Sequence, residues 1–396
     1  MGSKVNSAMA YCKFRADQLF TGYTLLNENH VLITSENGTV EDVITLENAG
    51  EGIRQFQGIL SPGFINCHCH LELSHMRSNI PAGTGLTGFI ASVMQYAQPA
   101  QDFKDEQMRL ADEEMYNSGI VAVGDISNQV YSLSQKSKSK IRWYNFIEIT
   151  NPDDEKAEAK LSAFKTIADQ FSGTLYPPGN TALSPHAIYS VSPQTFNLIN
   201  QSTQNKTITI HNQECADEDE LLKNGAGKFL RFYESIGRKT LPIPPSGKSS
   251  IQTWLPYFNN GQTIISVHNT YISEEDIVFA KNYAAANGLE IIFCLCPNAN
   301  LYIENRLPPV DLFIKHNCNI VLGTDSYGSN WQLSIAKEMV AIRQHLPHVP
   351  LEKRLNWATA NGAGALGFKD LGSFEKGKRP GIVLTGNDWN NSKRIL

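Results

Sequence analysis

From about residue 59 to residue 367, apolar runs with strand character alternate with amphipathic stretches of helical periodicity. Strands that alternate with helices predict a parallel sheet with right-handed crossovers. Eight such strands are the number that closes a (β/α)8 (TIM) barrel, and the segment has room for one with insertions. The expected strands lie at 59–68, 120–126, 141–149, 181–188, 207–211, 263–268, 289–296 and 319–324, and clear helical patterns at 155–171, 274–287 and 333–345.

The two flanks of this segment differ from it. Short β-like pieces at 18–26 and 30–35 are broken by Asn and Gly, and a similar piece lies at 382–384. Two terminal β segments predict one small β-sandwich domain built from both chain ends. We therefore expect an α/β protein in which 1–58 and 369–396 form the small domain and 59–368 form the barrel. Pro and Gly predict loops at 176–179 and at 238–250. The second loop is expected to be exposed and to lie beside the candidate site described below.

Composition limits the partners. The chain is 41% hydrophobic and 18% charged, as in ordinary globular proteins. A net charge of −5 without a basic cluster argues against nucleic acid. No run approaches the roughly 18 apolar residues that span a bilayer, and residues 1–7 lack the shape of a signal peptide. Seven cysteines without disulfide-scaffold spacing indicate free thiols in a reducing cytoplasm. We expect a small-molecule substrate and no membrane partner, and leave a homodimer open.

A His-x-His pair ends the first predicted barrel strand. Residues i and i+2 of a strand point to one face, so His68 and His70 can aim their imidazoles at one point. The same alternation turns Cys67 and Cys69 away, toward the core. A single pair of this kind is weak support for a metal site, because a histidine at a strand end more often hydrogen-bonds a loop.

Further polar residues follow the carboxyl ends of other predicted strands, where barrels of this kind gather their function. They are His186, His211, His268 and Asp325. Taken singly, each has an ordinary interpretation, such as Asp325 as a helix cap. Six such residues at one rim instead favour a mononuclear metal site. Three imidazoles and one carboxylate with an open position suit Zn²⁺, and Fe²⁺ is the alternative.

These motifs resemble the amidohydrolase superfamily, in particular its metal-dependent deaminase branch. The resemblance spans nearly the whole chain and is strongest at 62–70, 185–190, 211–214, 267–269, 296–301 and 323–330. Within the branch, the segments 68–74, 124–128, 229–236 and 267–269 resemble the aminodeoxyfutalosine deaminases of the alternative menaquinone pathway most. The S-adenosylhomocysteine and methylthioadenosine deaminases are similar to a smaller degree. Because Pro185 and His186 stand where binuclear members carry a bridging lysine, the resemblance implies one metal.

The resemblance also implies a role for each residue. One zinc would be held by His68, His70, His211 and Asp325 and would lower the pKa of a water. Glu214, three residues after His211, would protonate a ring nitrogen of the substrate. Asp325 would accept the proton of the water, and His268 would orient the attacking oxygen.

For the substrate, the resemblance implies contacts from His186 and from Glu72, the latter with ribose hydroxyls. Apolar walls for a bulky 5′ group are expected from Phe229, Phe232, Tyr233 and Trp254. The expected activity is hydrolytic deamination of an adenine nucleoside, with release of ammonia. Alternatives are another aminated purine, pterin or pyrimidine base, or hydrolysis of a cyclic amide or chloro-substituted ring. A third alternative is a barrel that has lost catalysis and serves as an assembly or binding module. That alternative predicts that metal ligands are missing, and none is missing from this sequence.

Overall fold

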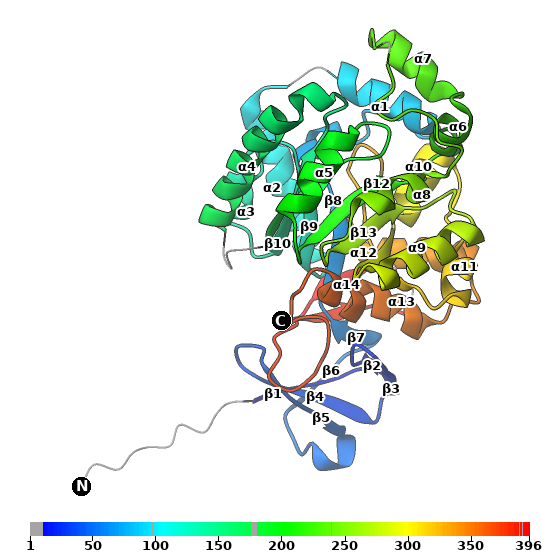
Figure 1. The fold of residues 1–396 in the computed structure, drawn as a ribbon. Coiled ribbons are helices and arrows are strands. Elements are labelled where there is room, and N and C mark those ends of the chain that lie inside the picture. The colour runs from blue at the N-terminus through cyan, green and yellow to red at the C-terminus, as the bar shows by residue number, and fades with distance from the viewer. Residues whose placement is uncertain (1–10, 97–98, 176–179, 239, 388, 390) are drawn as a thin grey trace.

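The structure is a computed structural model that describes residues 11–96, 99–175, 180–238, 240–387, 389 and 391–396 (Figure 1). The predictions for residues 1–7 and for the loop at 176–179 lie outside the described residues. The fold is mixed α/β, as predicted, and Figure 1 shows a small β part below a larger helix-covered part.

Two four-stranded parallel sheets form the centre of the larger part. Their strand orders are β11-β10-β9-β8 and β12-β13-β14-β15. The strands are β8 (Phe64–Cys69), β9 (Ile120–Ser127), β10 (Arg142–Ile149), β11 (Thr181–Pro185), β12 (Thr207–Asn212), β13 (Thr263–His268), β14 (Glu290–Leu295) and β15 (Asn319–Leu322). Parallel bridges join the edges of the two sheets, one between Cys69 and Asp325 and one between Ala187 and His211. All eight predicted segments therefore contain a strand of these sheets.

The predicted strand at 59–68 is wrong as a single element, because the run contains two strands. β7 (Ile59–Pro62) pairs with β16 (Ile382–Thr385) and with β2 (Gln18–Phe20), whereas β8 pairs with β9. Gly63 separates them in a crowded position. A Cβ at Gly63 would lie 2.2 Å from Val121 Cγ1 and 2.7 Å from Pro380 O. The chain can pass from one sheet to the other here because glycine has no side chain.

The small β part holds both ends of the described chain. One sheet has the order β5-β4-β1-β6, and the other has the order β17-β16-β7-β2-β3. Their remaining strands are β1 (Tyr11–Arg15), β3 (Leu25–Asn27), β4 (His30–Ser35), β5 (Val40–Thr45), β6 (Ile53–Gln55) and β17 (Ser392–Arg394). The predicted piece at 18–26 is therefore a hairpin of β2 and β3. A separate apolar cluster that includes Phe14, Leu60 and Leu384 packs in this part.

Helices surround the parallel sheets on the outside and over one end (Figure 1). They are α1 (Gly85–Gln95), α2 (Gln101–Asn117), α3 (Leu133–Lys136), α4 (Ala157–Thr174), α5 (Pro193–Ser202), α6 (Ala216–Asn224), α7 (Lys228–Ser235), α8 (Ser250–Trp254), α9 (Glu274–Ala286), α10 (Pro297–Glu304), α11 (Val310–Lys315), α12 (Ile335–His345), α13 (Leu351–Ala358) and α14 (Ala360–Ala365). Ser273 and Asp276 form a reciprocal capping box at the start of α9. Across the described residues, no helix is long and apolar enough to cross a membrane.

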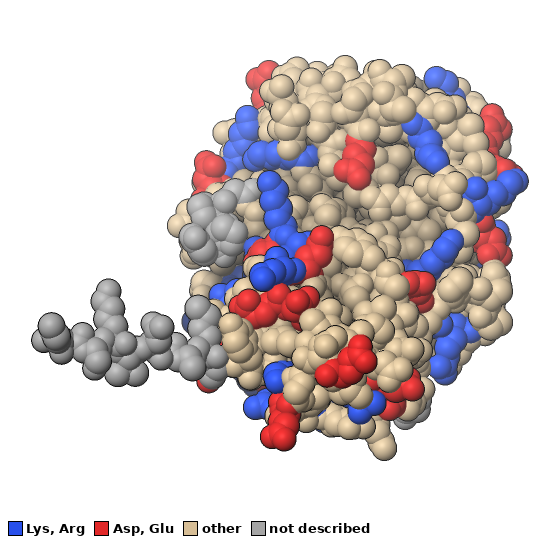
Figure 2. All heavy atoms as spheres, turned by 90° about the horizontal axis from the view of Figure 1, so that it is seen from below, with Lys and Arg blue, Asp and Glu red and all other residues tan. Residues whose placement is uncertain are grey.

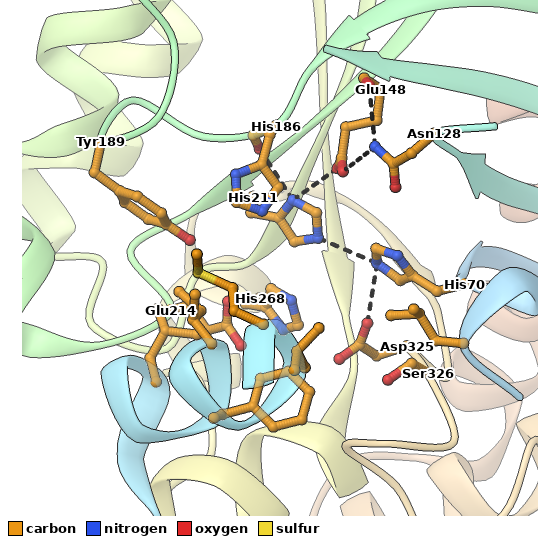
Figure 3. A pocket seen from close by; sticks show the side chains of 16 residues that line it. His70, Asn128, Glu148, His186, Tyr189, His211, Glu214, His268, Asp325 and Ser326 are labelled. Atoms are coloured by element: carbon orange, nitrogen blue, oxygen red, sulfur yellow. Dashed lines mark hydrogen bonds and ion pairs between the residues drawn. The ribbon is translucent and has the colours of Figure 1, made fainter. Parts of the chain in front are cut away.

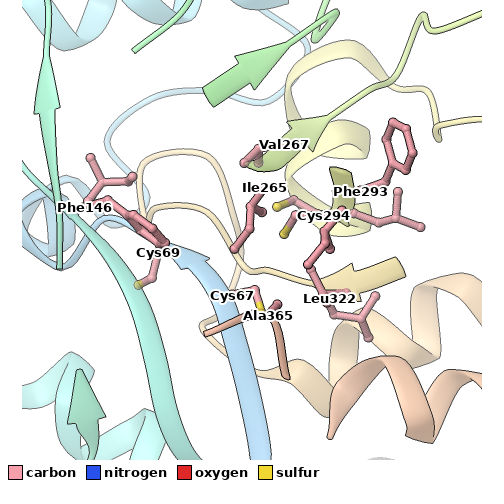
Figure 4. Packing of buried hydrophobic residues seen from close by; sticks show 14 of the residues in the cluster. Cys67, Cys69, Phe146, Ile265, Val267, Phe293, Cys294, Leu322 and Ala365 are labelled. Atoms are coloured by element: carbon pink, nitrogen blue, oxygen red, sulfur yellow. The ribbon is translucent and has the colours of Figure 1, made fainter. Parts of the chain in front are cut away.

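The main core lies within and around the parallel sheets (Figure 4). Cys67, Cys69 and Cys294 are fully buried there among apolar side chains such as Phe146 and Ile265. All seven cysteines are free thiols, as predicted. On the face shown in Figure 2, basic and acidic side chains are interspersed.

Gly63→Ala should lower the melting temperature, because the new methyl group overlaps Val121 and a backbone carbonyl. Overpacking of this kind typically costs ~1–3 kcal/mol. Gly364→Ala, at an exposed position of α14 with no atom within 4 Å of the new Cβ, is the matched control and should be neutral or slightly stabilising. Thermal unfolding followed by circular dichroism compares the two. Equal melting temperatures would contradict the role of Gly63 at this junction.

Candidate metal centre

Five polar side chains converge where the carboxyl ends of the parallel strands meet, and Figure 3 shows four of them, His70, His211, His268 and Asp325. His68 lies in β8, and His70 directly follows that strand. His211 lies in β12, His268 ends β13, and Asp325 follows β15. The structure thus brings together every residue predicted to hold or activate the metal.

The spacing of four of these donors fits a tetrahedral ion. His70 Nε2 lies 3.2 Å from His68 Nε2, 3.4 Å from His211 Nε2 and 3.2 Å from Asp325 Oδ1. His68 Nε2 and Asp325 Oδ1 are 3.4 Å apart. Zinc with bonds of ~2.0–2.1 Å gives donor–donor edges of about 3.3–3.4 Å. His268 also lies close, since one donor atom each from His68, His211, His268 and Asp325 fall within 4.8 Å of one another.

The protonation of the cluster also favours a bound cation. Burial lowers the pKa of His68 and of His70, and lowers the pKa of His211 to about 4, so these rings are neutral. His211 Nδ1 donates to the backbone oxygen of His186 at 2.9 Å, which leaves Nε2 as a lone-pair donor. His211 Nε2 therefore directs an unshared electron pair at His70 Nε2, 3.4 Å away, and a cation held among these donors would be stabilised by it.

Asp325 supplies the negative charge of the cluster. Burial alone would raise the pKa of its carboxyl group, but the imidazoles of His68 and His70 hold that pKa well below its usual range. Oδ1 faces the histidines, and Oδ2 accepts a hydrogen bond of 2.5 Å from Ser329 Oγ. The carboxylate is thus ionised and fixed in orientation.

Glu214 is the second carboxylate of the site and has the opposite character. Its Oε2 lies 3.6 Å from His268 Nε2, and the side chain is buried. Burial, together with the nearby Asp325 carboxylate, raises the pKa of Glu214 well above its usual value. Two carboxyl groups whose pKa values are pushed apart are suited to act as acid and base.

The backbone is strained where it presents these side chains. Gln213, His268, Asn269 and Asp325 adopt positive φ angles of 46°, 70°, 55° and 59°. Such conformations cost non-glycine residues of order 1–3 kcal/mol each and gather at functional sites. Backbone bonds hold them in place: Asn269 N donates to Asn212 O at 2.9 Å, and Asp325 N donates to His68 O at 3.0 Å.

A buried ion pair supports the turn after His70. Asp125 Oδ1 accepts a hydrogen bond of 2.8 Å from Leu71 N, and Oδ2 lies 2.6 Å from Lys136 Nζ. Lys136 also donates to Ser127 Oγ and to Asn145 Oδ1, at 3.0 and 2.9 Å. The fully hydrogen-bonded pair fixes the backbone of the residue next to a candidate ligand.

Of the two residues predicted to bind the substrate, the structure places His186 at a cavity and Glu72 away from it. His186 follows β11 and lines the cavity of about 200 Å³ above the histidine cluster (Figure 3). Glu72 does not line it, since its carboxylate accepts hydrogen bonds from Asn128 N, Gln129 N and Ser132 Oγ. Burial of Glu72 raises the pKa of its carboxyl group to about 7.

Sequence reasoning missed Glu148 and its partner Asn128, which both line the cavity. Glu148 stands near the end of β10 and is only 4% exposed. No motif marks it. The available signal was a charged residue near the carboxyl end of a mostly apolar strand.

A second cavity of about 440 Å³ adjoins the first, and both are lined by Ile90, Met94, His186 and Tyr189. Of the four predicted apolar walls, Phe232 and Tyr233 line this second cavity. Phe229 and Trp254 are fully buried and line neither of these two cavities. Trp254 Nε1 donates to Asn212 Oδ1 at 2.8 Å, so that side chain supports the strand end beside His211.

The predicted exposed loop at 238–250 is exposed only in part. Pro244 and Lys248 are exposed, whereas Pro242 and Ile243 are buried. Arg238 lines the second cavity and pairs with Asp153 at 2.9 Å. The segment therefore packs on the body of the protein beside the site.

Comparison with known proteins agrees with this geometry. The sequence profile of the Amidohydrolase family matches residues 59–394. The chain belongs to this family. Membership confirms the predicted hydrolytic, metal-dependent enzyme that acts on carbon–nitrogen bonds, and the histidine–aspartate cluster fits a metal site.

Individual relatives are distant. The chain is similar to a 5-methylthioadenosine/S-adenosylhomocysteine deaminase of Clostridium tetani, at 25% identity over 93% of this chain and 81% of the relative. The crystal structure of Helicobacter pylori aminofutalosine deaminase has a TM-score of 0.77 at 22% identity, over 95% of this chain and 92% of that one. An adenosine deaminase from Xanthomonas campestris with bound zinc has a TM-score of 0.65 at 21% identity, over 94% and 84% of the two chains.

Protein purified without chelator should carry about one transition metal per chain, mostly zinc. His211→Ala should lose most of it, because the variant lacks one of four converging donors. His348→Ala, which changes an exposed histidine paired with Asp311, is the matched control and should retain the metal. Elemental analysis of the three proteins measures this. Two tightly held metals per chain, or full metal in the His211 variant, would contradict the ligand assignment.

Proposed function

We propose that this amidohydrolase is a zinc-dependent deaminase that converts an adenine nucleoside to its 6-oxo product with release of ammonia. The observation that carries the proposal is Glu214. It is a buried carboxyl group with a raised pKa, beside His268 and facing the metal-binding cluster. Relatives named as adenosine-type deaminases support the same class of substrate.

The proposal includes the architecture around the site. We infer that the two parallel sheets form one closed (β/α)8 barrel, supported by the bridges that join both pairs of edges. The two remaining sheets, which share an apolar cluster, would form the terminal β-sandwich. The domain assignment of 59–368 to the barrel and of both flanks to the sandwich is part of this proposal, although β7 lies in a sheet of the small part. The free cysteines suit a cytoplasmic location.

The donor set of His68, His70, His211 and Asp325 would hold the zinc. When bound, zinc would supply Lewis-acid activation of water near neutral pH. Asp325, ionised and held by Ser329, accepts a proton as the oxygen attacks the ring carbon that bears the amino group. His268 lies where its Nε2 can orient that oxygen.

Glu214 acts as the acid in this scheme. Its raised pKa keeps a proton available, and transfer of that proton to the adjacent ring nitrogen makes the ring carbon electrophilic. The carbon–nitrogen bond to the amino group then breaks: Asp325 gives the proton that it accepted to the departing nitrogen, which leaves as ammonia, and the hydroxyl proton passes to Glu214 as the 6-oxo group forms. Hydrolysis of a cyclic amide or of a chloro-substituted ring does not require a ring-nitrogen acid in this position, so Glu214 favours deamination.

The substrate that we place first is aminodeoxyfutalosine, an adenine nucleoside with an aromatic 5′ extension. The cavity at the metal cluster would take the base and ribose. The adjoining second cavity, with Phe232 and Tyr233 in its wall, would take the extension. Similarity to the aminofutalosine deaminase structure supports this choice.

Glu214→Gln should retain the fold and the metal but lose most deaminase activity. The amide keeps the shape but cannot deliver a proton, and a positioned acid contributes ~10²–10⁴-fold. Glu220→Gln, an exposed substitution on α6, is the control and should turn over normally. Ammonia release with adenosine measures both. Near-normal turnover of the Glu214 variant would move the acid role to another residue.

A panel of substrates tests the nucleoside assignment. We expect kcat/KM to be highest for aminodeoxyfutalosine, lower for S-adenosylhomocysteine, methylthioadenosine and adenosine, and lowest for free guanine, pterins and cytosine. Apolar walls discriminate weakly, by ~1–3 kcal/mol per methylene, so related nucleosides should be accepted. A free base that exceeds every nucleoside would overturn the assignment while leaving the zinc chemistry intact.

A further inference from the structure

We propose that a cavity at the opposite end of the parallel strands from the metal centre binds a small divalent oxyanion, such as a phosphate group. The cavity has a volume of about 240 Å³. Among the described residues that line it, four are basic and one is acidic, so we call it the basic cavity. The basic residues are Lys140, Arg142, Arg379 and Arg394, and the acidic residue is Asp370. No step of the proposed deamination uses this cavity, so the inference does not depend on the proposed function.

The basic cavity lies between two parts of the chain. Val121 stands near the start of β9 and Arg142 begins β10, which places the cavity at the amino ends of these parallel strands. Arg379 precedes β16, and Arg394 lies in β17, in a sheet of the small β part. An anion held here therefore links the small β part to the parallel sheets.

The carboxylate of the basic cavity is already neutralised. Arg142 Nη1 donates to both Oδ1 and Oδ2 of Asp370, at 2.7 Å each. In the described part of the chain, Lys140, Arg379 and Arg394 form no ion pair with an acidic side chain. Three positive charges thus remain around one cavity without a counter-charge. A cavity lined by charges of one sign concentrates ions of the opposite sign.

The unpaired cations are held at the cavity by contacts that leave their charge intact. Lys140 Nζ and Arg394 Cζ lie 5.2 and 4.7 Å from the centre of the Tyr116 ring. Burial lowers the pKa of Arg394, so its charged form gains from a neighbouring anion. Arg394 Nη1 is inaccessible, and Nη2 is the nitrogen beside the cavity, 3.5 Å from the position of a Cβ on the lining residue Gly381. Arg379 N donates to Asp370 O at 2.9 Å, which fixes the third cation beside the others.

The chemistry of these side chains selects an oxyanion. Guanidinium groups present planar N–H donors that match the oxygens of phosphate or carboxylate, and an ammonium group adds a point charge. Arg379 and Arg394 supply the unpaired guanidinium groups, and Lys140 supplies the ammonium group. Several unpaired cations at one place favour a divalent anion over chloride. Inorganic phosphate is a simple ion of this class and is the probe.

Titration calorimetry of the zinc-loaded enzyme with inorganic phosphate, at constant ionic strength, tests the site. Wild type should bind phosphate, and Arg379→Gln and Arg394→Gln should each bind it roughly 10- to 100-fold more weakly, as for a lost hydrogen bond to a charged group. Lys393→Gln is the matched control and should bind like wild type, because Lys393 is an exposed residue of β17 that does not line the cavity. Zinc content should be the same in all four proteins.

Two calorimetric results would overturn the inference. One is the absence of phosphate binding to wild type. The other is binding that both arginine variants retain in full but that His211→Ala loses, because the phosphate would then sit at the metal centre.

Thermal unfolding provides a second readout. Phosphate should raise the melting temperature of wild type and of Lys393→Gln, as a ligand of the folded state does, and should raise that of Arg379→Gln and Arg394→Gln less. An equal rise in all four proteins would reflect only the general stabilisation that phosphate salts give to folded proteins, and it would contradict a site at these residues.

Discussion

The structure depends on one electrostatic constraint: several imidazoles and an ionised carboxylate are packed together in one buried place. His70 Nε2 is within 3.4 Å of a nitrogen or oxygen atom of each of His68, His211 and Asp325. These separations are the ones expected of donors that share one ion, and a bound cation would stabilise the arrangement. Several otherwise costly features maintain it, among them the left-handed backbone at His268 and Asp325 and the buried Asp125–Lys136 pair.

The same constraint gives two carboxyl groups of the site different pKa values. Asp325 lies against the imidazoles, which stabilise its charge, whereas Glu214 is buried with another carboxylate nearby. Their pKa values therefore move in opposite directions within one small cavity. We propose that this difference lets one residue accept a proton while the other delivers one, so hydrolysis can proceed at neutral pH.

Much of the site could be predicted from the sequence, because its residues sit in motifs at strand ends. His68, His70, His211, His268 and Asp325 each follow an apolar run, and parallel strands bring such ends together. The boundary at Gly63 could not be predicted. The run at 59–68 is apolar throughout, and only its pairing partners, β16 for one half and β9 for the other, divide it. Glu148 was missed for a related reason, since only the fold places it in the cavity beside its hydrogen-bond partner Asn128.

The most direct test of the central claim is X-ray absorption at the zinc edge of the purified enzyme. The account predicts one zinc per chain in a first shell of nitrogen and oxygen at about 2.0–2.1 Å, with the outer-shell scattering of three imidazoles. A sulfur shell near 2.3 Å would show that buried cysteines such as Cys69 or Cys296 are ligands. A metal–metal vector at about 3.5–4 Å would show a binuclear site. Either result would contradict the mononuclear centre of His68, His70, His211 and Asp325.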